Sequence, residues 1–274
     1  MSATVTAVGS GAPTRAPFGP RREAGDRSTA VATLLGAIGL VAVWAWFARG
    51  QPELILPSPA ETARAFADLA REGVLVSETL RTIVRAVVAV AIALGIGVAW
   101  GTLNGVSRWA SAASQTALAS LMALPPIVLV VVGLTWLGPG AATTRLVIVL
   151  VAVPLIVVAV AEAVRDIDAD LLEMAAAFEL GRVRTLRHVV APAIASPVLA
   201  AASVVVGQSV RVAVMAELLS AADGIGAEVA RARANVETAD VFAWALTLIA
   251  VVLVVELAVL RPLTRRALRW RQPN

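Results

Sequence analysis

Long uncharged apolar runs alternate with short charged stretches over most of this chain. Several runs reach the roughly 20 residues that an α-helix needs to cross about 30 Å of hydrocarbon. This pattern predicts an all-α membrane protein with six transmembrane helices. The predicted spans cover approximately residues 30–48, 86–107, 110–136, 145–162, 189–213 and 241–260.

Proline and glycine divide the longest uncharged run, residues 109–144, which is too long for a single span. Pro125 and Pro126 each remove a backbone N–H and clash with the preceding turn. The Gly-Pro-Gly sequence at 138–140 is typical of a turn. We therefore predict a broken third span, a tight turn and a fourth span.

The first apolar run could also be read as a cleaved signal peptide. It is long for the apolar part of such a peptide, and no A-x-A cleavage site follows it, so a transmembrane span is favoured. Residues 1–28 are rich in Gly, Pro, Ser and Arg and lack apolar periodicity. This predicts a disordered basic tail ahead of a transmembrane domain at 29–271.

The sequence just after the first span contains the signals of a helix N-terminus. Ser58 is a predicted N-cap, Pro59 suits the first helical position, and Glu61 completes a capping box. The helix that follows, to about Glu72, is too charged to span and is predicted to lie at the membrane interface.

The distribution of arginine predicts the orientation in the membrane. The tail, the loop at Arg108, residues 162–188 and the C-terminus hold 14 of the 23 arginines, whereas the alternate loops hold eight. By the positive-inside rule, both termini and the 162–188 segment are expected to be cytoplasmic. Arg81 and Arg85 run against this bias.

Composition excludes several classes of function. Hydrophobic residues make up 59% and charged residues 15% of the chain, against about 25% charged in soluble domains. The net charge of +4 does not predict a nucleic-acid partner, because the arginines lie at the ends of apolar runs rather than on one soluble face. With no cysteine and one histidine, His188, neither thiol catalysis nor a Cys- or His-rich metal site is expected.

The chain also contains no lysine, so it cannot carry the phosphate-binding loop, which requires one. If ATP drives this protein, a separate subunit hydrolyses it.

Residues 166–192 are the most informative polar segment. They predict a cytoplasmic helix, a turn containing Gly181, and a second, basic helix that Pro192 joins to the next span. Two short helices held at the membrane surface could dock a motor protein, because packed helices transmit rigid-body motion. The alternative is an ordinary amphipathic loop with a chance Glu-Ala spacing.

This segment resembles the cytoplasmic loop of permeases from bacterial binding-protein-dependent ABC importers. In that family an E-A-A pattern, then G, then I-x-L-P forms a coupling helix that sits in a cleft of the ATPase. Glu173 and Ala175 fit the first part, and residues 187–190 with Pro192 fit the last. The resemblance implies that the coupling residues are Glu173, Ala175, Glu179, Gly181, Arg182, Arg187 and Pro192.

One position departs from the family pattern. The family's glycine falls on Glu179, and a glycine follows two residues later at Gly181. Either the turn is made two residues further on, or the helix continues through Glu179.

Other motifs extend the resemblance over roughly residues 50–271, towards the nitrate, sulfonate, taurine and bicarbonate branch of the family. They are LPSP at 56–59, LPP at 124–126, AELL at 216–219, GIG at 224–226, RAR at 231–233, VFA at 241–243 and LRWR at 268–271.

The resemblance implies a non-catalytic permease of the bacterial inner membrane that imports a small anionic solute resembling a sulfonate, nitrate or taurine. Its implied partners are two copies of an ABC ATPase, an extracytoplasmic solute-binding protein and a second permease copy, which is expected to form a homodimer. ATP and Mg²⁺ are expected on the ATPase, and no cofactor is expected on this chain.

Polar side chains at membrane depth are costly and usually face the bundle interior or an aqueous path. On this ground Gln115, Gln208, Arg211 and Glu217 are candidates for the substrate pathway. Gln208 and Arg211 are three residues apart and share a helix face, and an arginine on the path would favour an anion. Alternatively, Arg211 extends to the outer surface and Gln208 makes a helix–helix hydrogen bond.

Two other classes of function are weaker alternatives. An ATP-independent secondary transporter or channel would need carboxylates near mid-membrane, and the centres of the predicted spans have none. An intramembrane enzyme would need a nucleophile and base, or metal ligands, within the bilayer, and the composition argues against these.

Overall fold

The computed structural model describes residues 26–260, which divide into two units, one ending at Gly50 and one beginning at Gln51. The first 25 residues of the predicted tail and residues 261–271 of the predicted domain lie outside the described range. Helix α1 (Asp26–Ala48) already includes the last three residues assigned to the tail. By itself, α1 is long and apolar enough to cross a membrane, and residues 31–48 of it are mostly exposed.

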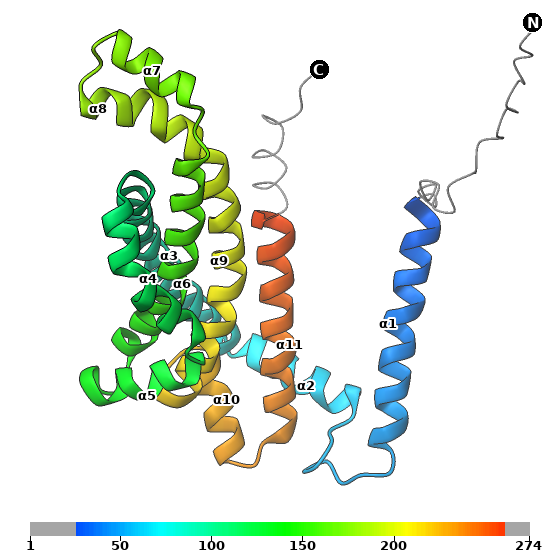
Figure 1. Cartoon of the computed structure of the whole chain (residues 1–274). Coiled ribbons are helices and arrows are strands. Elements are labelled where there is room, and N and C mark those ends of the chain that lie inside the picture. Colours follow the sequence, from blue (N-terminus) through cyan, green and yellow to red (C-terminus); the bar gives the residue numbers. More distant parts are fainter. Residues whose placement is uncertain (1–25, 261–274) are drawn as a thin grey trace, which may run out of the picture. The chain divides into compact units, whose positions relative to one another are not determined.

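The second unit contains the remaining helices (Figure 1). In chain order they are α2 (Pro59–Arg71), α3 (Val74–Val106), α4 (Arg108–Ala123), α5 (Pro126–Leu137), α6 (Ala141–Arg165), α7 (Ala169–Ala177), α8 (Arg182–Thr185), the π-helix η1 (Leu186–Val190), α9 (Ala191–Ser220), α10 (Ile225–Ala234), α11 (Thr238–Val255) and the π-helix η2 (Glu256–Leu260).

The described residues confirm the predicted fold class. They form helices, turns and bends, with no strand between residues 26 and 260. Five helices are long and apolar enough to span a membrane, and the bent pair α4–α5 makes six if it counts as one span. Of the segment predicted to carry the coupling helix, α7 lies between the fourth and fifth of the six, and α8 overlaps the start of the fifth.

The break predicted in the third span is present. Helix α4 ends before Leu124, Pro126 occupies the first turn of α5, and the two helix axes differ by 101°. Since Pro126 lacks an N–H, it fits a helix start, where that group would have no partner. A second bend at Gly138–Gly140 is fastened by the Thr143 hydroxyl, which donates to the Gly138 carbonyl at 2.6 Å.

The predicted capping box at Ser58 is also confirmed. The Glu61 N–H donates to Ser58 Oγ at 3.3 Å, and the Ser58 N–H donates to the Glu61 carboxylate at 2.6 Å. This hydrogen bond from the Ser58 backbone lowers the pKa of the Glu61 carboxyl. The sequence therefore specifies the start of α2 through two reciprocal bonds.

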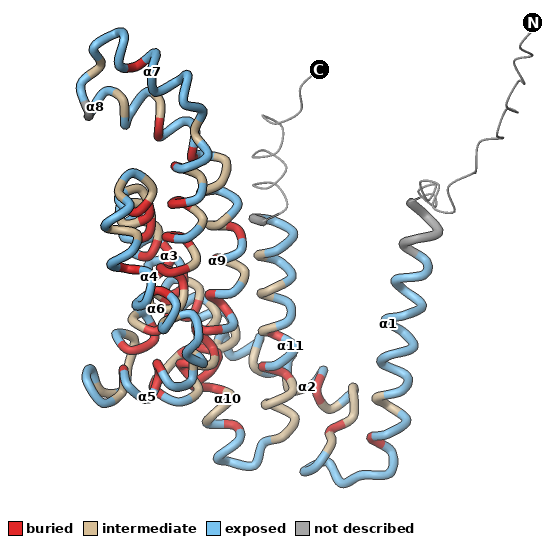
Figure 2. The backbone as a smooth tube through the Cα atoms, in the orientation of Figure 1, coloured by how far each residue is buried: buried red, intermediate tan, exposed pale blue. Residues whose placement is uncertain are grey.

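The core lies where α3, α6 and α9 meet, while the outward faces of these helices are largely exposed (Figure 2). Those outward faces are themselves apolar, and include Val87, Ile92 and Ile96 on α3. A soluble protein rarely exposes so much apolar surface, whereas a membrane protein presents it to lipid.

Glycine lets α3 approach α6 unusually closely. Gly97, Gly101 and Gly105 recur every four residues on one face of α3 and lie against Ile156, Val160 and Val164, which recur every four residues on α6. A Cβ at Gly101 would lie 2.7 Å from Val160 Cβ and 2.9 Å from the Val157 carbonyl oxygen. Such small-residue stripes drive helix association in membranes, where lipid removes the usual hydrophobic gain.

We expect Gly101→Ala to lower the free energy of unfolding by about 1–3 kcal/mol, because the added methyl must push the two helices apart. Gly95→Ala is the matched control, since no atom lies within 4 Å of the Cβ position and the substitution favours helix. Thermal unfolding of both variants in the same detergent measures the difference. Equal melting temperatures would contradict the close-packing account.

Candidate functional site

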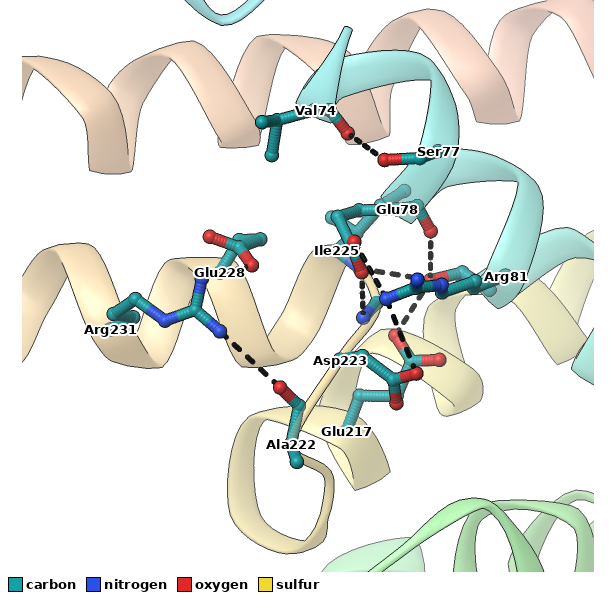
Figure 3. A network of polar contacts seen from close by, with 12 residues as sticks. Val74, Ser77, Glu78, Arg81, Glu217, Ala222, Asp223, Ile225, Glu228 and Arg231 are labelled. Carbon is teal, nitrogen blue, oxygen red and sulfur yellow. Dashed lines mark hydrogen bonds and ion pairs between the residues drawn. The ribbon is translucent and has the colours of Figure 1, made fainter. Parts of the chain in front are cut away.

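The ends of α3, α9 and α10 meet at a polar junction formed by Glu78, Thr82, Arg85, Glu217 and Asp223. Glu78, Glu217 and Asp223 are labelled in Figure 3. Arg85 Nη1 donates to Glu217 Oε1 at 2.9 Å and to the Asp223 carbonyl at 2.8 Å, and its other Nη atom pairs with the Asp223 carboxylate. Thr82 and Glu217 are fully buried, and the Arg85 side chain is 11% exposed. The buried carboxylate and guanidinium are therefore paired with each other.

The same junction satisfies the N-terminus of α10. The N–H groups of Gly224, Ile225 and Gly226 donate in turn to Glu78 Oε2 at 2.7 Å, Thr82 Oγ1 at 2.9 Å and Glu217 Oε2 at 3.3 Å. These N–H groups have no partner within the helix, and a helix N-terminus favours negative charge. Side chains from α3 and α9 thus act as the cap of α10.

The geometry explains the Gly-Ile-Gly sequence at 224–226. A Cβ at Gly226 would lie 2.2 Å from the Val214 carbonyl oxygen, and one at Gly224 would lie 2.6 Å from the Glu217 carboxylate. Gly224 also has φ +102°, a conformation that side chains disfavour. Both glycines are needed for α10 to lie against α9, and Ile225 between them is buried beside Trp244 of α11.

Further charges surround the junction (Figure 3). Arg81 pairs with Glu78 at 2.8 Å and with Asp223 at 3.4 Å, and Arg231 pairs with Glu228 at 2.5 Å. Burial raises the pKa of the Glu228 carboxyl. Arg81 and Arg85, which run against the arginine bias of the sequence, are thus offset by nearby acids.

At the opposite end of the second unit, α7 and α8 extend past the spans (Figure 1). Ala175 is buried, whereas Phe178 is 73% exposed and Val183 79% exposed. Leu171, Leu172 and Met174 of α7 are exposed as well. We call α7, α8 and the connection between them the knob, residues 169–185; it presents an apolar surface at the end of the second unit opposite the polar junction.

The turn in the knob is made at Glu179, which corrects both expectations for this position. Glu179 has φ +51°, its N–H donates to the Ala176 carbonyl, and the Leu180 N–H donates to the Ala175 carbonyl. These two bonds form a Schellman motif, in which the left-handed residue is usually glycine. Glu179 therefore takes the conformation of the glycine that it replaces, and Gly181 follows the turn.

The remaining predicted coupling residues lie on the knob or directly after it. Glu173 lies on α7, Arg182 begins α8, Arg187 is in η1 and Pro192 is in the first turn of α9. Helices α8, η1 and α9 follow one another without a loop, and residues 183–220 together are long and apolar enough to span a membrane. The π-helical turn directly before Pro192 is a common way for a helix to absorb a local irregularity.

The pathway candidates separate into three places. Gln208 and Arg211 line a hollow of about 520 Å³ between α9 and the end of α11, together with Ser203, Val252 and Glu256. Gln115 lines a different hollow, between α3, α4 and α6. Glu217 lines neither and is enclosed in the polar junction, where its position indicates a structural role.

Comparison with known sequences identifies the family. Residues 91–269 match the family of binding-protein-dependent transport system inner membrane components. The chain belongs to this family. It is thus a permease component of an ABC importer, in agreement with the motifs of residues 56–271.

The descriptions of individual relatives name different transported solutes. The chain is 26% identical over 242 residues to SsuC of Bacillus subtilis, described as an aliphatic sulfonates transport permease protein, and covers 84% of that protein with 88% of its own length. It is 32% identical over 224 residues to the riboflavin transport system permease protein RibX of Chloroflexus aurantiacus, covering 82% of RibX with 81% of its own length.

A solved structure shares the fold. A chain from the MetNI methionine ABC transporter, captured in inward-facing conformations, superposes with a TM-score of 0.61 at 20% identity. The match covers 72% of the present chain and 98% of that chain.

Sequence reasoning missed several of these residues. Thr82, Arg85 and Asp223 became visible only when the helices were brought together, although Arg85 stood out against the charge bias. Phe178 and Val183 are apolar residues in a polar segment, a signal that could have been used. Glu256 falls within the last predicted span and was not singled out.

We expect Arg85→Gln to lower the free energy of unfolding by about 3 kcal/mol, because it leaves the Glu217 carboxylate buried with one charged partner fewer. Glu217→Gln is also expected to destabilise the protein, and the double variant should lose less than the sum of the two. Denaturant titration in detergent measures all three.

Arg71→Gln is the control, because the ion pair of Arg71 with Asp68 is exposed and should contribute less than about 1 kcal/mol. Additive losses at Arg85 and Glu217 would show that the two groups are not coupled.

Proposed function

We propose that this chain forms the membrane path of an importer for a small anionic solute, driven by an ABC ATPase that docks on the knob. The exposed apolar surface of α7 and α8 carries this proposal. Phe178 and Val183 would face water on a chain working alone, and contiguous exposed apolar surface outside the membrane marks a site of protein association.

The orientation follows from the positive-inside rule, with the knob and both termini cytoplasmic. Arg182, Arg184 and Arg187 lie on or next to the knob. The polar junction and α10 lie at the other end of the second unit and would then face the binding protein (Figure 1). Two permease copies, most simply identical, would each engage one ATPase.

Buried contacts and a fixed turn hold the two helices of the knob in place. Ala175 is buried and holds the inner face of α7, so Ala175 positions the helix rather than contacting the ATPase. Glu179 fixes the turn between the two short helices through the Schellman motif. The partner surface is therefore expected to be apolar at Phe178, Met174 and Val183, with Glu173 and the arginines of α8 and η1 around it.

The hollow at Arg211 supports an anionic solute. Arg211 and Gln208 lie on one exposed face of α9, and no ion pair of Arg211 is found among residues 26–260. An unpaired charge at membrane depth is costly unless water or a polar solute reaches it. Aliphatic sulfonates, named in the description of SsuC, have the charge that Arg211 would attract.

Substitution at Phe178 tests the docking of the ATPase. We expect Phe178→Asp to reduce copurification of the ATPase by at least about tenfold, because the aspartate would have to lose water in an apolar interface. Ile55→Asp is the control, since Ile55 is similarly exposed on a different segment of the chain. Undiminished ATPase binding in Phe178→Asp would exclude the knob as the docking surface.

Substitution at Arg211 tests the solute path. We expect Arg211→Gln to lower uptake of an aliphatic sulfonate at limiting concentration about fivefold or more, because a charge-assisted hydrogen bond is lost. Arg211→Lys should retain part of the uptake, and ATPase copurification should not change in either variant. The measurement is uptake by vesicles that contain the complete transporter, and unaltered uptake in Arg211→Gln would argue against the path.

A further inference from the structure

A second hollow, of about 410 Å³, opens between α3, α4 and α6. It lies apart from the hollow at Arg211, and the two share no residue. Its lining changes character along its length, with polar residues at one end and apolar residues at the other. The polar residues are Asn104, Ser111, Gln115, Glu162 and Arg165, and the apolar ones are Leu118, Ala119, Met122, Val157, Val158 and Ala161.

The polar end lies at the level where the chain leaves the membrane. Arg165 is the last residue of α6, and the knob follows a few residues later. Asn104 is in the last turn of α3, and Ser111 is in the first turn of α4. Val157 lies eight residues before Arg165, which places the apolar end about 12 Å deeper along α6. The gradient of polarity therefore runs along the helix axes, as it does in a membrane lipid.

Two charged side chains at the polar end, Glu162 and Arg165, do not form an ion pair with each other. At Asp68–Arg71, Glu78–Arg81 and Glu228–Arg231, an arginine pairs with the acid three residues before it. Glu162 and Arg165 have the same spacing, but Arg165 Nη2 donates instead to the Asn104 carbonyl at 3.2 Å and to Ser111 Oγ at 2.7 Å. Within residues 26–260, the Glu162 carboxylate has no ion pair.

A buried acceptor beside these charges also lacks a partner. Asn104 is 4% exposed, and its Nδ2 donates to Ser114 Oγ at 2.7 Å. Its Oδ1 has no hydrogen bond among the described residues. Turning the amide over would not help, because the Ser114 hydroxyl already donates to the Ala110 carbonyl at 2.8 Å. This oxygen is enclosed by protein, so the groups that the hollow offers to a ligand are the charges of Glu162 and Arg165.

We propose that this hollow is a binding site for one phosphatidylethanolamine molecule. Its phosphate lies on the Arg165 guanidinium, its ammonium on the Glu162 carboxylate, and an acyl chain along Leu118, Met122 and Val158. The headgroup supplies one anion and one hydrogen-bond donor, matching the separated charges of Arg165 and Glu162.

Other occupants fit less well. A purely anionic headgroup would bring its negative charge next to the Glu162 carboxylate and offer no cation to pair with it. Phosphatidylcholine has the same charges, but its methylated ammonium donates no N–H to Glu162. A small polar solute would leave Met122 and Val158 facing water. The inference does not depend on which solute is transported or on the ATPase.

The test uses native mass spectrometry of the full-length chain in a mild detergent, titrated with phosphatidylethanolamine, phosphatidylcholine or phosphatidylglycerol. We expect one tightly held phosphatidylethanolamine per chain, with the other two lipids about tenfold weaker. Glu162→Gln should weaken phosphatidylethanolamine about tenfold and leave phosphatidylcholine unchanged. Glu237→Gln, on the connection between α10 and α11, is the control and should change neither.

Met122→Trp provides a second arm, because it fills the apolar end without altering any charge and should reduce retention of all three lipids. Met122→Trp also tests the site if Glu162→Gln does not fold. The proposal is overturned if phosphatidylcholine binds as tightly as phosphatidylethanolamine, or if neither Glu162→Gln nor Met122→Trp changes retention. It is equally overturned if a transported solute displaces the lipid and Glu162→Gln abolishes uptake, because the hollow would then belong to the solute path.

Discussion

The close approach of α3 to α6 is the interaction on which the rest of this fold depends. Lipid is as apolar as the helix faces, so burying valine between two helices gains little unless the backbones come near enough for dense packing. The glycines at 97, 101 and 105 permit that approach, and the branched residues of α6 fill the space above them. With this pair fixed, α9 can pack across both helices and complete the core.

The buried charges of the polar junction fix the register of the helix ends, which apolar packing alone would leave undetermined. The helix ends at the polar junction could slide if only apolar contacts held them, but Arg85 and Glu217 are buried and satisfied in one arrangement of α3, α9 and α10. A buried ion pair is often neutral for stability and costly to break, which makes it a device for register. Positions 224 and 226 must then be glycine, because the Glu217 carboxylate and the Val214 carbonyl occupy the space that a Cβ would need.

Local rules predicted much of this structure, and non-local contacts account for what they missed. The cap at Ser58, the break at Pro125–Pro126 and the six spans depend on neighbouring residues and on bilayer thickness, so the sequence reveals them. Glu179 in a left-handed turn depends on two backbone bonds that override its side-chain preference, and a glycine rule cannot anticipate this. From the sequence, Glu217 is a candidate for the solute path because only its depth can be read there, whereas its partners Thr82 and Arg85 lie more than 130 positions away in the chain.

The continuity of α8, η1 and α9 connects the two ends of the second unit mechanically. From Val183 to Ser220 the chain is helical without an intervening loop, although the direction changes between α8 and α9 (Figure 1). The knob lies at one end and the polar junction at the other, with the Arg211 hollow between them. A displacement of the knob can therefore reach α10 through one packed element, without an intervening loop to absorb it. Since the junction also fixes α3 to α9, such a displacement would move α3 together with α9, and α11 would follow α10 because Trp244 packs on Ile225.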